Sequence, residues 1–246
     1  MSDASPQLSV IIPAFNEERR LPRTLDEVLG YLTRQPYQSE VLVVDDGCDD
    51  GTARLVRERA ATLAVPLAVI AHPDGRNHGK GAAVRRGMLA AHGRYRLFMD
   101  ADNSTAIAHL DSFWPFFDSG CDAVIGSRDV AGADVALHQS WYRELAGKLG
   151  NLVIQLLAVP GIHDTQTGFK MFSERCVADV FPRLTIDRWG FDVEILAVCR
   201  ARGYRVQELP VRWVNQPDSK LGMGSYFEVL GEVWRVRRNL RAGRYR

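Results

Sequence analysis

The first half of the chain alternates short, unbroken apolar runs with longer amphipathic stretches. The apolar runs predict buried strands over residues 8–12, 40–44, 67–71, 95–99 and 123–126. Apolar residues at helical spacing predict helices over residues 17–31, 52–62 and 80–91. Strands that are apolar throughout and alternate with helices are typical of an α/β fold, with a mostly parallel central sheet flanked by helices.

The second half is less regular. Its pattern predicts helices over residues 140–159 and 191–202, a strand over 205–211 and a final amphipathic helix over 225–240. Pro210 cannot donate to a ladder hydrogen bond and places the strand at an edge of the sheet. We find no linker. We therefore expect one domain over residues 1–224 and a C-terminal helical appendage over residues 225–246.

Composition narrows the class of protein. The chain has 246 residues and a formal net charge of +1, so no global field steers it toward nucleic acid. The N-terminal residues lack the basic and apolar segments of a signal peptide. No apolar run approaches the roughly 20 residues of a membrane span. We expect a cytoplasmic protein, which is free to lie on the cytoplasmic face of a membrane.

Carboxylates gather where the predicted strands end. Asp100 and Asp102 follow the fourth strand directly, and Asp45 and Asp46 follow the second. In parallel sheets the ligand sits beyond the carboxyl ends of the strands. Paired carboxylates repel one another and favour a cation, and oxygen ligands favour Mg²⁺ or Mn²⁺. The alternative is a solvated acidic loop. Asp45 or Asp46 is suited to accept hydrogen bonds from a ribose or a base edge.

These motifs together resemble a known family. The segments 9–17, 43–52 and 100–102 read SVIIPAFNE, VVDDGCDDGT and DAD, and this order resembles the family 2 inverting glycosyltransferases. The segments 79–85, 126–128, 164–170 and 189–194 read GKGAAVR, GSR, DTQTGFK and WGFDVE. They resemble the dolichyl-phosphate glucosyltransferase and mannose synthase branch. The likeness runs from about Leu8 to Val214.

The resemblance implies a nucleotide-diphospho-sugar transferase (GT-A) fold and a set of site residues. Asp100 and Asp102 inherit the role of metal ligands. The nucleotide site is expected to be lined by Pro13, Ala14, Glu17, Asp46 and Asp102. The sequence departs from the pattern of the branch at two positions. Ser104 stands where mannose synthases have a third metal ligand, a glutamine, and Cys48 replaces the usual serine after Asp-Asp-Gly.

The acceptor determines which further groups are needed. An alcohol must lose a proton to a positioned base, whereas a lipid phosphate is already ionised and needs cations that hold it in line. In the mannose synthase pattern, arginines that match Arg128 and Arg143 hold the acceptor phosphate. The alternative for each is a surface arginine or a salt bridge. Asp192 is the first candidate for the base if the acceptor is an alcohol.

Several other residues are expected near the donor or the acceptor. Lys80 begins a predicted helix, where a positive charge opposes the helix dipole, and this favours contact with an anion such as the donor phosphates. Arg85 follows one turn later. The alternative for Lys80 is an ordinary helix start. We also expect Gln166, Asp192 and Glu194 near the sugar and the acceptor, although Asp192 and Glu194 are equally consistent with a solvated helix.

The C-terminal helix has the pattern of a membrane-surface segment. Residues 225–246 carry six arginines against Glu228 and Glu232. The apolar side is predicted to comprise Tyr226, Val229, Leu230, Val233, Val236 and Leu240. A basic amphipathic helix is typical of binding to anionic lipid. The alternative is that the apolar side packs on the domain and the arginines are solvated. The stripe from Trp141 to Leu156 has the same two interpretations, with core packing favoured.

The leading hypothesis is inverting transfer of a hexose, glucose first, from a UDP-sugar to a polyprenyl or dolichyl phosphate. A second hypothesis keeps the donor and sends the sugar to a hydroxyl on a glycan, a protein or a small molecule. A third is a module that binds nucleotide-sugars without turnover, against which the two carboxylates argue because a binder need not hold a metal. The sequence does not define the sugar or the oligomeric state.

Overall fold

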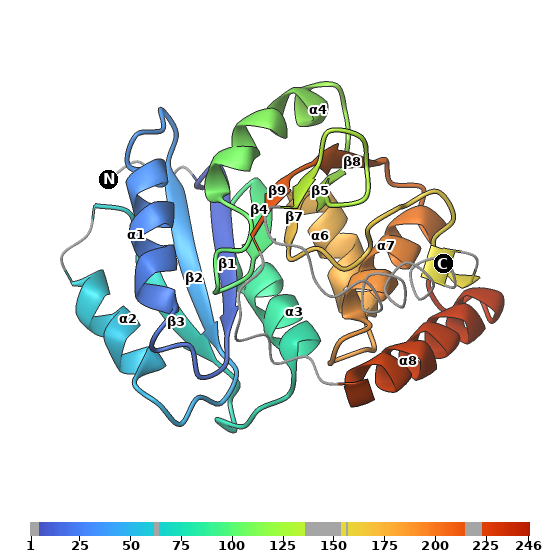
Figure 1. Cartoon of the computed structure of the whole chain (residues 1–246), viewed down its shortest axis with the longest axis horizontal. Helices are drawn as coiled ribbons and strands as arrows, with labels where there is room; N and C mark the ends of the chain where they lie inside the picture. The colour runs from blue at the N-terminus through green and yellow to red at the C-terminus, as the bar shows by residue number, and fades with distance from the viewer. Residues whose placement is uncertain (1–4, 62–63, 136–153, 156, 215–222) are drawn as a thin grey trace.

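The protein was analysed as a computed structural model, which describes residues 5–61, 64–135, 154–155, 157–214 and 223–246, with the side chains of the last range from 228 onward. The predicted helix over residues 140–159, its apolar stripe and Arg143 lie largely outside these ranges. A seven-stranded sheet forms the centre of the molecule, with the strand order β3-β2-β1-β4-β7-β5-β8 (Figure 1).

The strands of the first half match the predicted runs. They are β1 (Leu8–Ala14), β2 (Ser39–Asp45), β3 (Leu67–Ala71), β4 (Tyr95–Met99) and β5 (Ala123–Ser127). The helices between them are α1 (Leu21–Leu32), α2 (Thr52–Ala60) and α3 (Lys80–Ala90). β1 pairs in parallel with β2 and β4, and β2 with β3. β8 (Val206–Pro210) pairs in parallel with β5 at the edge, where Pro210 was predicted to place it.

The remaining elements complete the covering of the sheet. After β4 come two short helices, the 3₁₀ segment Ile107–Ser112 and α4 (Trp114–Asp118). The second half contains the helices α6 (Glu174–Val180), α7 (Phe191–Ala201) and α8 (Met223–Arg241) and the 3₁₀ turn Phe181–Arg183. It also contains a separate two-stranded sheet of β6 (Asp134–Val135) and β9 (Arg212–Trp213).

One strand of the central sheet was not predicted, and neither were the two short strands β6 and β9. β7 (Phe169–Ser173) runs antiparallel between β4 and β5 and pairs with both. The run Phe-Lys-Met-Phe contains a charged residue, Lys170, and therefore does not read as a buried strand. The lysine is nevertheless fully buried. The sheet is thus mostly parallel, with one antiparallel strand near its centre.

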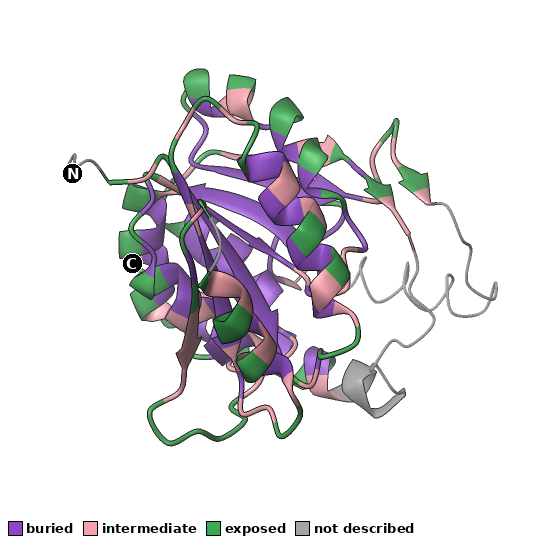
Figure 2. Ribbon diagram, turned by 90° about the vertical axis from the view of Figure 1, so that its left-hand side faces the viewer, coloured by how far each residue is buried: buried purple, intermediate pink, exposed green. Residues whose placement is uncertain are grey.

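The sheet separates two hydrophobic cores. Successive side chains of a strand point to opposite faces, so Ile11 and Phe98 pack with α3, α6, α7 and α8, whereas Val10, Ile12 and Leu97 pack with α1 and α4. Figure 2 shows the inner strands of the sheet buried and the exposed residues on the outer sides of the helices. The unbroken apolar runs of the sequence are explained by this burial on both faces.

The start of α1 differs from the prediction. The helix begins at Leu21 rather than at Glu17, because Asn16 has a positive φ of 54° and residues 17–20 form a turn. Pro22 lies in the first turn, where its missing N–H costs nothing. Glu17 is therefore presented from a turn at the end of β1, next to the edge of the sheet where the strands end.

Candidate active site at the strand ends

The ends of β1 and β2 bring together the residues predicted for the nucleotide. Pro13 and Ala14 close β1, and the Ala14 carbonyl accepts a hydrogen bond from the Asp46 N–H at 2.9 Å. The Glu17 carboxylate pairs with Arg20, with both contacts at 2.7 Å. Asp45 Oδ1 accepts from the Cys48 N–H at 2.8 Å, which closes the turn after β2.

Asp46 ties the loop before α3 to the end of β2. Its side chain is only 3% exposed. It accepts hydrogen bonds from the Asn77 amide at 2.9 Å and from the N–H groups of His78 at 2.9 Å and Gly79 at 3.0 Å. His72 Nε2 lies 3.2 Å from Asp46 Oδ1. Of these partners, only Gly79 belongs to a quoted motif, and the pairing itself could not be predicted from the sequence. Asp46 therefore fixes the loop before α3 against the end of β2.

Asp100 and Asp102 lie at the end of β4 and close to one another. Burial raises the pKa of the Asp102 carboxyl, and the neighbouring Asp100 carboxylate raises it further. Asp102 Oδ1 accepts from the Ser104 N–H at 2.9 Å. Lys80 Nζ, from the start of α3, lies 2.6 Å from Asp100 Oδ1. Burial opposes the charge of Lys80, but Asp100 and then Asp192 outweigh it and raise its pKa.

The segment before β7 passes against Asp100. The Asp100 N–H donates to the Gly168 carbonyl at 3.1 Å. A Cβ at Gly168 would lie 2.1 Å from an Asp100 carboxylate oxygen, so only glycine leaves room for this side chain. The glycine of the DTQTGFK segment therefore leaves the space that the Asp100 side chain occupies. Gln166, two residues earlier, is exposed on the same segment.

Arg128 follows β5 and pairs with Asp164. Arg128 Nε and Nη2 contact the two carboxylate oxygens at 2.7 and 3.0 Å, and the Arg128 N–H also donates to Asp164 at 3.0 Å. The guanidinium lies 5.2 Å from the centre of the Trp213 ring. Burial opposes ionisation of Asp164, but Arg128 outweighs it and lowers the pKa of this carboxyl. The pair holds the guanidinium in one orientation, and neither contact uses Nη1.

Asp192 is buried and does not face solvent, unlike the base that was expected for an alcohol acceptor. It is 3% exposed, and its Oδ1 lies 2.5 Å from Nζ of the fully buried Lys170. Burial raises the pKa of Asp192 and lowers that of Lys170, and each charge partly offsets the effect on the other. Glu194, two residues further along α7, is fully buried and accepts hydrogen bonds from the N–H groups of Thr185 and Ile186. These contacts are structural.

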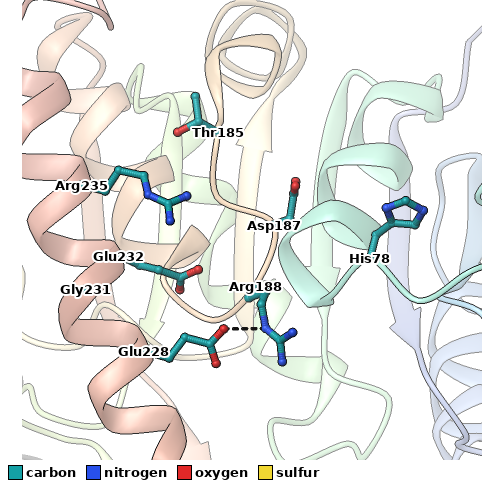
Figure 3. A pocket seen from close by; sticks show the side chains of 8 residues that line it. All are labelled: His78, Thr185, Asp187, Arg188, Glu228, Gly231, Glu232 and Arg235. Carbon is teal, nitrogen blue, oxygen red and sulfur yellow. Dashed lines mark ion pairs between the residues drawn. The ribbon is translucent and has the colours of Figure 1, made fainter.

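Arg85 also points to a loop of the second half. It donates to the Leu184 carbonyl at 2.9 Å and pairs with Asp187 at 2.8 Å. A pocket of about 500 Å³ adjoins this loop and faces α8 (Figure 3). Within it Arg188 pairs with Glu228 at 2.6 Å. His78 lines one side and so connects the pocket to the loop that Asp46 holds, but Asp100 and Asp102 are not among its lining residues.

The donor set at the end of β4 fits a hard divalent cation. Asp100 and Asp102 offer only oxygen atoms as ligands. The ion pair with Lys80 shows that Asp100 accepts a positive charge as its neighbour. In the part of the chain that the structure describes, no three His, Cys, Asp or Glu side chains gather as a complete metal site. Two carboxylates suit Mg²⁺ or Mn²⁺ when substrate phosphates and water supply the other ligands.

Comparison with solved structures defines the fold. The chain superposes with a TM-score of 0.68 on glucosyl-3-phosphoglycerate synthase from Mycobacterium tuberculosis, a structure in complex with Mn²⁺, UDP-glucose and phosphoglyceric acid. The match covers 94% of this chain and 80% of that chain, at 15% identity. The arrangement is the GT-A fold, as the resemblance implied.

Comparison with sequences defines the family. The model of glycosyl transferase family 2 matches residues 9–181, and the chain belongs to this family of glycosyltransferases. Dolichyl-phosphate β-glucosyltransferase of Dictyostelium discoideum is 34% identical over 94% of this chain and 73% of its own length. The enzyme of the same name from Drosophila melanogaster is 37% identical over 88% and 70%. Within the family, the chain falls in the dolichyl-phosphate β-glucosyltransferase branch.

Proposed function

We propose that this glycosyltransferase moves glucose from UDP-glucose to the phosphate of a dolichyl or polyprenyl phosphate, with inversion and with the help of a divalent metal ion. The observation that carries the proposal is the position of Asp100 and Asp102 at the end of β4, with Asp100 within electrostatic reach of Arg128 at the end of β5. The relatives named for this reaction support the acceptor, and the Mn²⁺ and UDP-glucose complex of the mycobacterial neighbour supports the donor and the metal.

On the donor side, the residues at the ends of β1 and β2 would hold the nucleotide. The buried Asp46 fixes the loop before α3, and Glu17 fixes the turn after β1. Asp100 and Asp102 would hold the metal ion. A bound Mg²⁺ or Mn²⁺ would neutralise the charge that develops on the departing diphosphate.

On the acceptor side, the geometry favours a group that is already ionised. An alcohol needs a base, but Asp192, the first candidate, is buried and paired with Lys170. A phosphate needs no base and requires an oriented cation instead. Arg128 meets this need, because Asp164 and Trp213 fix its guanidinium while Nη1 takes no part in the contact with Asp164. This contrast is the reason for preferring a lipid phosphate over a hydroxyl acceptor.

The acceptor is tested by a direct comparison. Purified protein with UDP-glucose and Mn²⁺ is expected to glucosylate a short dolichyl phosphate and to leave the matching dolichol unchanged. Transfer to the dolichol at a similar rate would favour the hydroxyl alternative. Binding of UDP-glucose without transfer to either acceptor, and without hydrolysis, would favour a module that binds without turnover.

Arg128→Ala is expected to reduce kcat/KM for dolichyl phosphate roughly 30-fold, because a charge-assisted contact with the phosphate is lost. The measurement is transfer at varied acceptor concentration, with UDP affinity measured in parallel. The substitution also leaves Asp164 without its partner. The double variant Arg128→Ala, Asp164→Asn removes this unpaired charge and serves as the control for folding. Unchanged acceptor kinetics in both variants would contradict the role of Arg128.

We also propose that the outer face of α8 rests on an anionic membrane surface. Val229, Val233 and Val236 pack in the core, as one of the two interpretations expected. The opposite face is exposed and carries Leu230 and Trp234, 42% and 60% exposed. Arg238 and Arg241 continue the same helical stripe and are exposed. Trp234 was not counted in the predicted apolar side. No helix in the described ranges is long and apolar enough to cross a bilayer.

The triple variant Trp234→Ala, Arg238→Gln, Arg241→Gln is expected to bind anionic vesicles about a hundredfold more weakly than the original protein. Each arginine near such a surface contributes about 1 kcal/mol, and the indole adds apolar burial. Sedimentation with phosphatidylserine vesicles measures the effect. Leu89→Ala, at a 45% exposed position on α3, is the matched control and should bind as before. Equal binding of the triple variant would exclude this face as the contact.

A further inference from the structure

Lys80 occupies an unusual position for a lysine. It is the first residue of α3, where the positive end of the helix dipole disfavours a cation. Its Nζ lies 2.6 Å from Asp100 Oδ1, and both side chains are partly exposed, at 23% and 31%. The carboxylate that the proposed function assigns to the metal therefore already has a cationic partner from the protein itself.

The backbone at Lys80 is held firmly in place. The preceding Gly79 has a φ of 102° and donates its N–H to Asp46 at 3.0 Å. The Ala82 N–H donates to the Asp187 carbonyl at 3.0 Å, and a Cβ at Gly79 would lie 2.6 Å from the same carbonyl. Because the start of the helix is fixed from both sides, a change in the partner of Lys80 requires only rotation of its side chain.

Lys80 also lies near Asp192 and Asp102, but its direct contact is with Asp100. Asp192 lies 2.5 Å from Lys170, which is fully buried and 5.3 Å from the centre of the Phe98 ring. Asp192 therefore has a cationic partner other than Lys80. An ammonium group at 2.6 Å and a divalent ion cannot share Asp100 favourably, because the two cations repel one another at such a distance.

We propose that Lys80 is a positioning residue that couples the binding of the metal to the binding of the nucleotide. Lys80 neutralises Asp100 until the metal ion arrives, and it then turns from the carboxylate to the diphosphate of the donor. The metal alone must displace an ion pair, whereas the metal together with a diphosphate gives Lys80 a new anionic partner. This inference rests on the proposed function, since it requires a metal at Asp100 and a diphosphate beside it.

The consequence is measurable as linkage between two ligands. Mn²⁺ alone should bind weakly, and UDP should strengthen its binding. Lys80→Met removes the competitor and should tighten the binding of Mn²⁺ alone about tenfold, within the range usual for coupled sites. The same variant should bind UDP more weakly in the presence of Mn²⁺, because the diphosphate then lacks its contact with the lysine. The factor by which UDP and Mn²⁺ strengthen one another should therefore fall about tenfold.

The experiment is a titration of Mn²⁺ followed by electron paramagnetic resonance, with and without UDP, supported by calorimetry of UDP with and without Mn²⁺. Neither readout depends on turnover. Lys80→Arg keeps the charge, so its Kd for Mn²⁺ alone should stay within about twofold of the Kd of the original protein. Arg57→Met removes one positive charge from an exposed position on α2 and controls for net charge.

The outcomes separate the inference from the function. If Lys80→Met binds Mn²⁺ alone no more tightly than the original protein, the coupling role of Lys80 is wrong. The role is also wrong if Lys80→Arg tightens Mn²⁺ binding as much as Lys80→Met does. Failure of the original protein to bind Mn²⁺ even with UDP present would instead contradict the proposed metal-dependent function.

Discussion

Asp100→Asn and Asp102→Asn should each reduce kcat/KM for glucosyl transfer about a thousandfold, because each removes a charged oxygen from the group that would hold the metal against the diphosphate. The assay measures transfer from UDP-glucose to dolichyl phosphate over a range of Mn²⁺ concentrations. Both variants should keep the melting temperature of the original protein to within a few degrees, since the two side chains lie at the surface edge of the sheet rather than in its cores.

Asp49→Asn is the matched control for this pair of variants. Asp49 is an exposed aspartate in the acidic segment after β2, and no role in the site is assigned to it. Its replacement makes the same chemical change and should leave kcat/KM nearly unaltered. If Asp100→Asn or Asp102→Asn retained activity within tenfold of the original at saturating donor, the metal assignment would have to be abandoned.

Lys170→Met should destabilise the fold by about 3–5 kcal/mol, because it leaves the Asp192 carboxylate buried without its partner. The ammonium group is fully buried and lies 2.5 Å from Asp192 Oδ1. In a chain of this size the loss corresponds to a fall in melting temperature of about 10 °C. Calorimetry or denaturant unfolding measures it.

The double variant Lys170→Met, Asp192→Leu, measured together with Asp192→Leu alone, completes the thermodynamic cycle. Removal of both charges should recover most of the lost stability, since a buried ion pair replaced by apolar groups of similar volume is often neutral. A double variant as unstable as Lys170→Met alone would show that the lysine stabilises the sheet by packing rather than by charge. The cycle therefore distinguishes structural compensation of Asp192 from simple loss of volume.

The first half of the fold was predictable because its strands are mostly apolar, and the inner strands β1 and β4 are buried on both faces. Leu67–Ala71 and Tyr95–Met99 match the predicted strands residue for residue. An unbroken apolar run bounded by polar residues has few other structures available to it. Because parallel strands end at one edge, the position of Asp46, Asp100 and Asp102 at that edge also followed from the sequence.

The partners of the site residues could not be predicted in the same way. Asp164 is 36 residues from Arg128, and Lys170 is 22 residues from Asp192. The contact of Lys170 depends on the position of β7, and β7 was missed because Lys170, its second residue, resembles a surface residue. A charged side chain within a run of aromatic and apolar residues was the available signal: a buried lysine requires a carboxylate nearby.

The antiparallel strand at the centre of the sheet has a consequence for synthesis of the protein. β7 lies between β4 and β5 in the sheet, so each of these strands has an unpaired edge until β7 has been synthesised. On the ribosome, the nascent chain exposes the unpaired edges of both strands until Ser173 has left the exit tunnel. The sheet therefore cannot be completed before residues 169–173 have been synthesised, and chaperones have a defined interval in which these edges need protection.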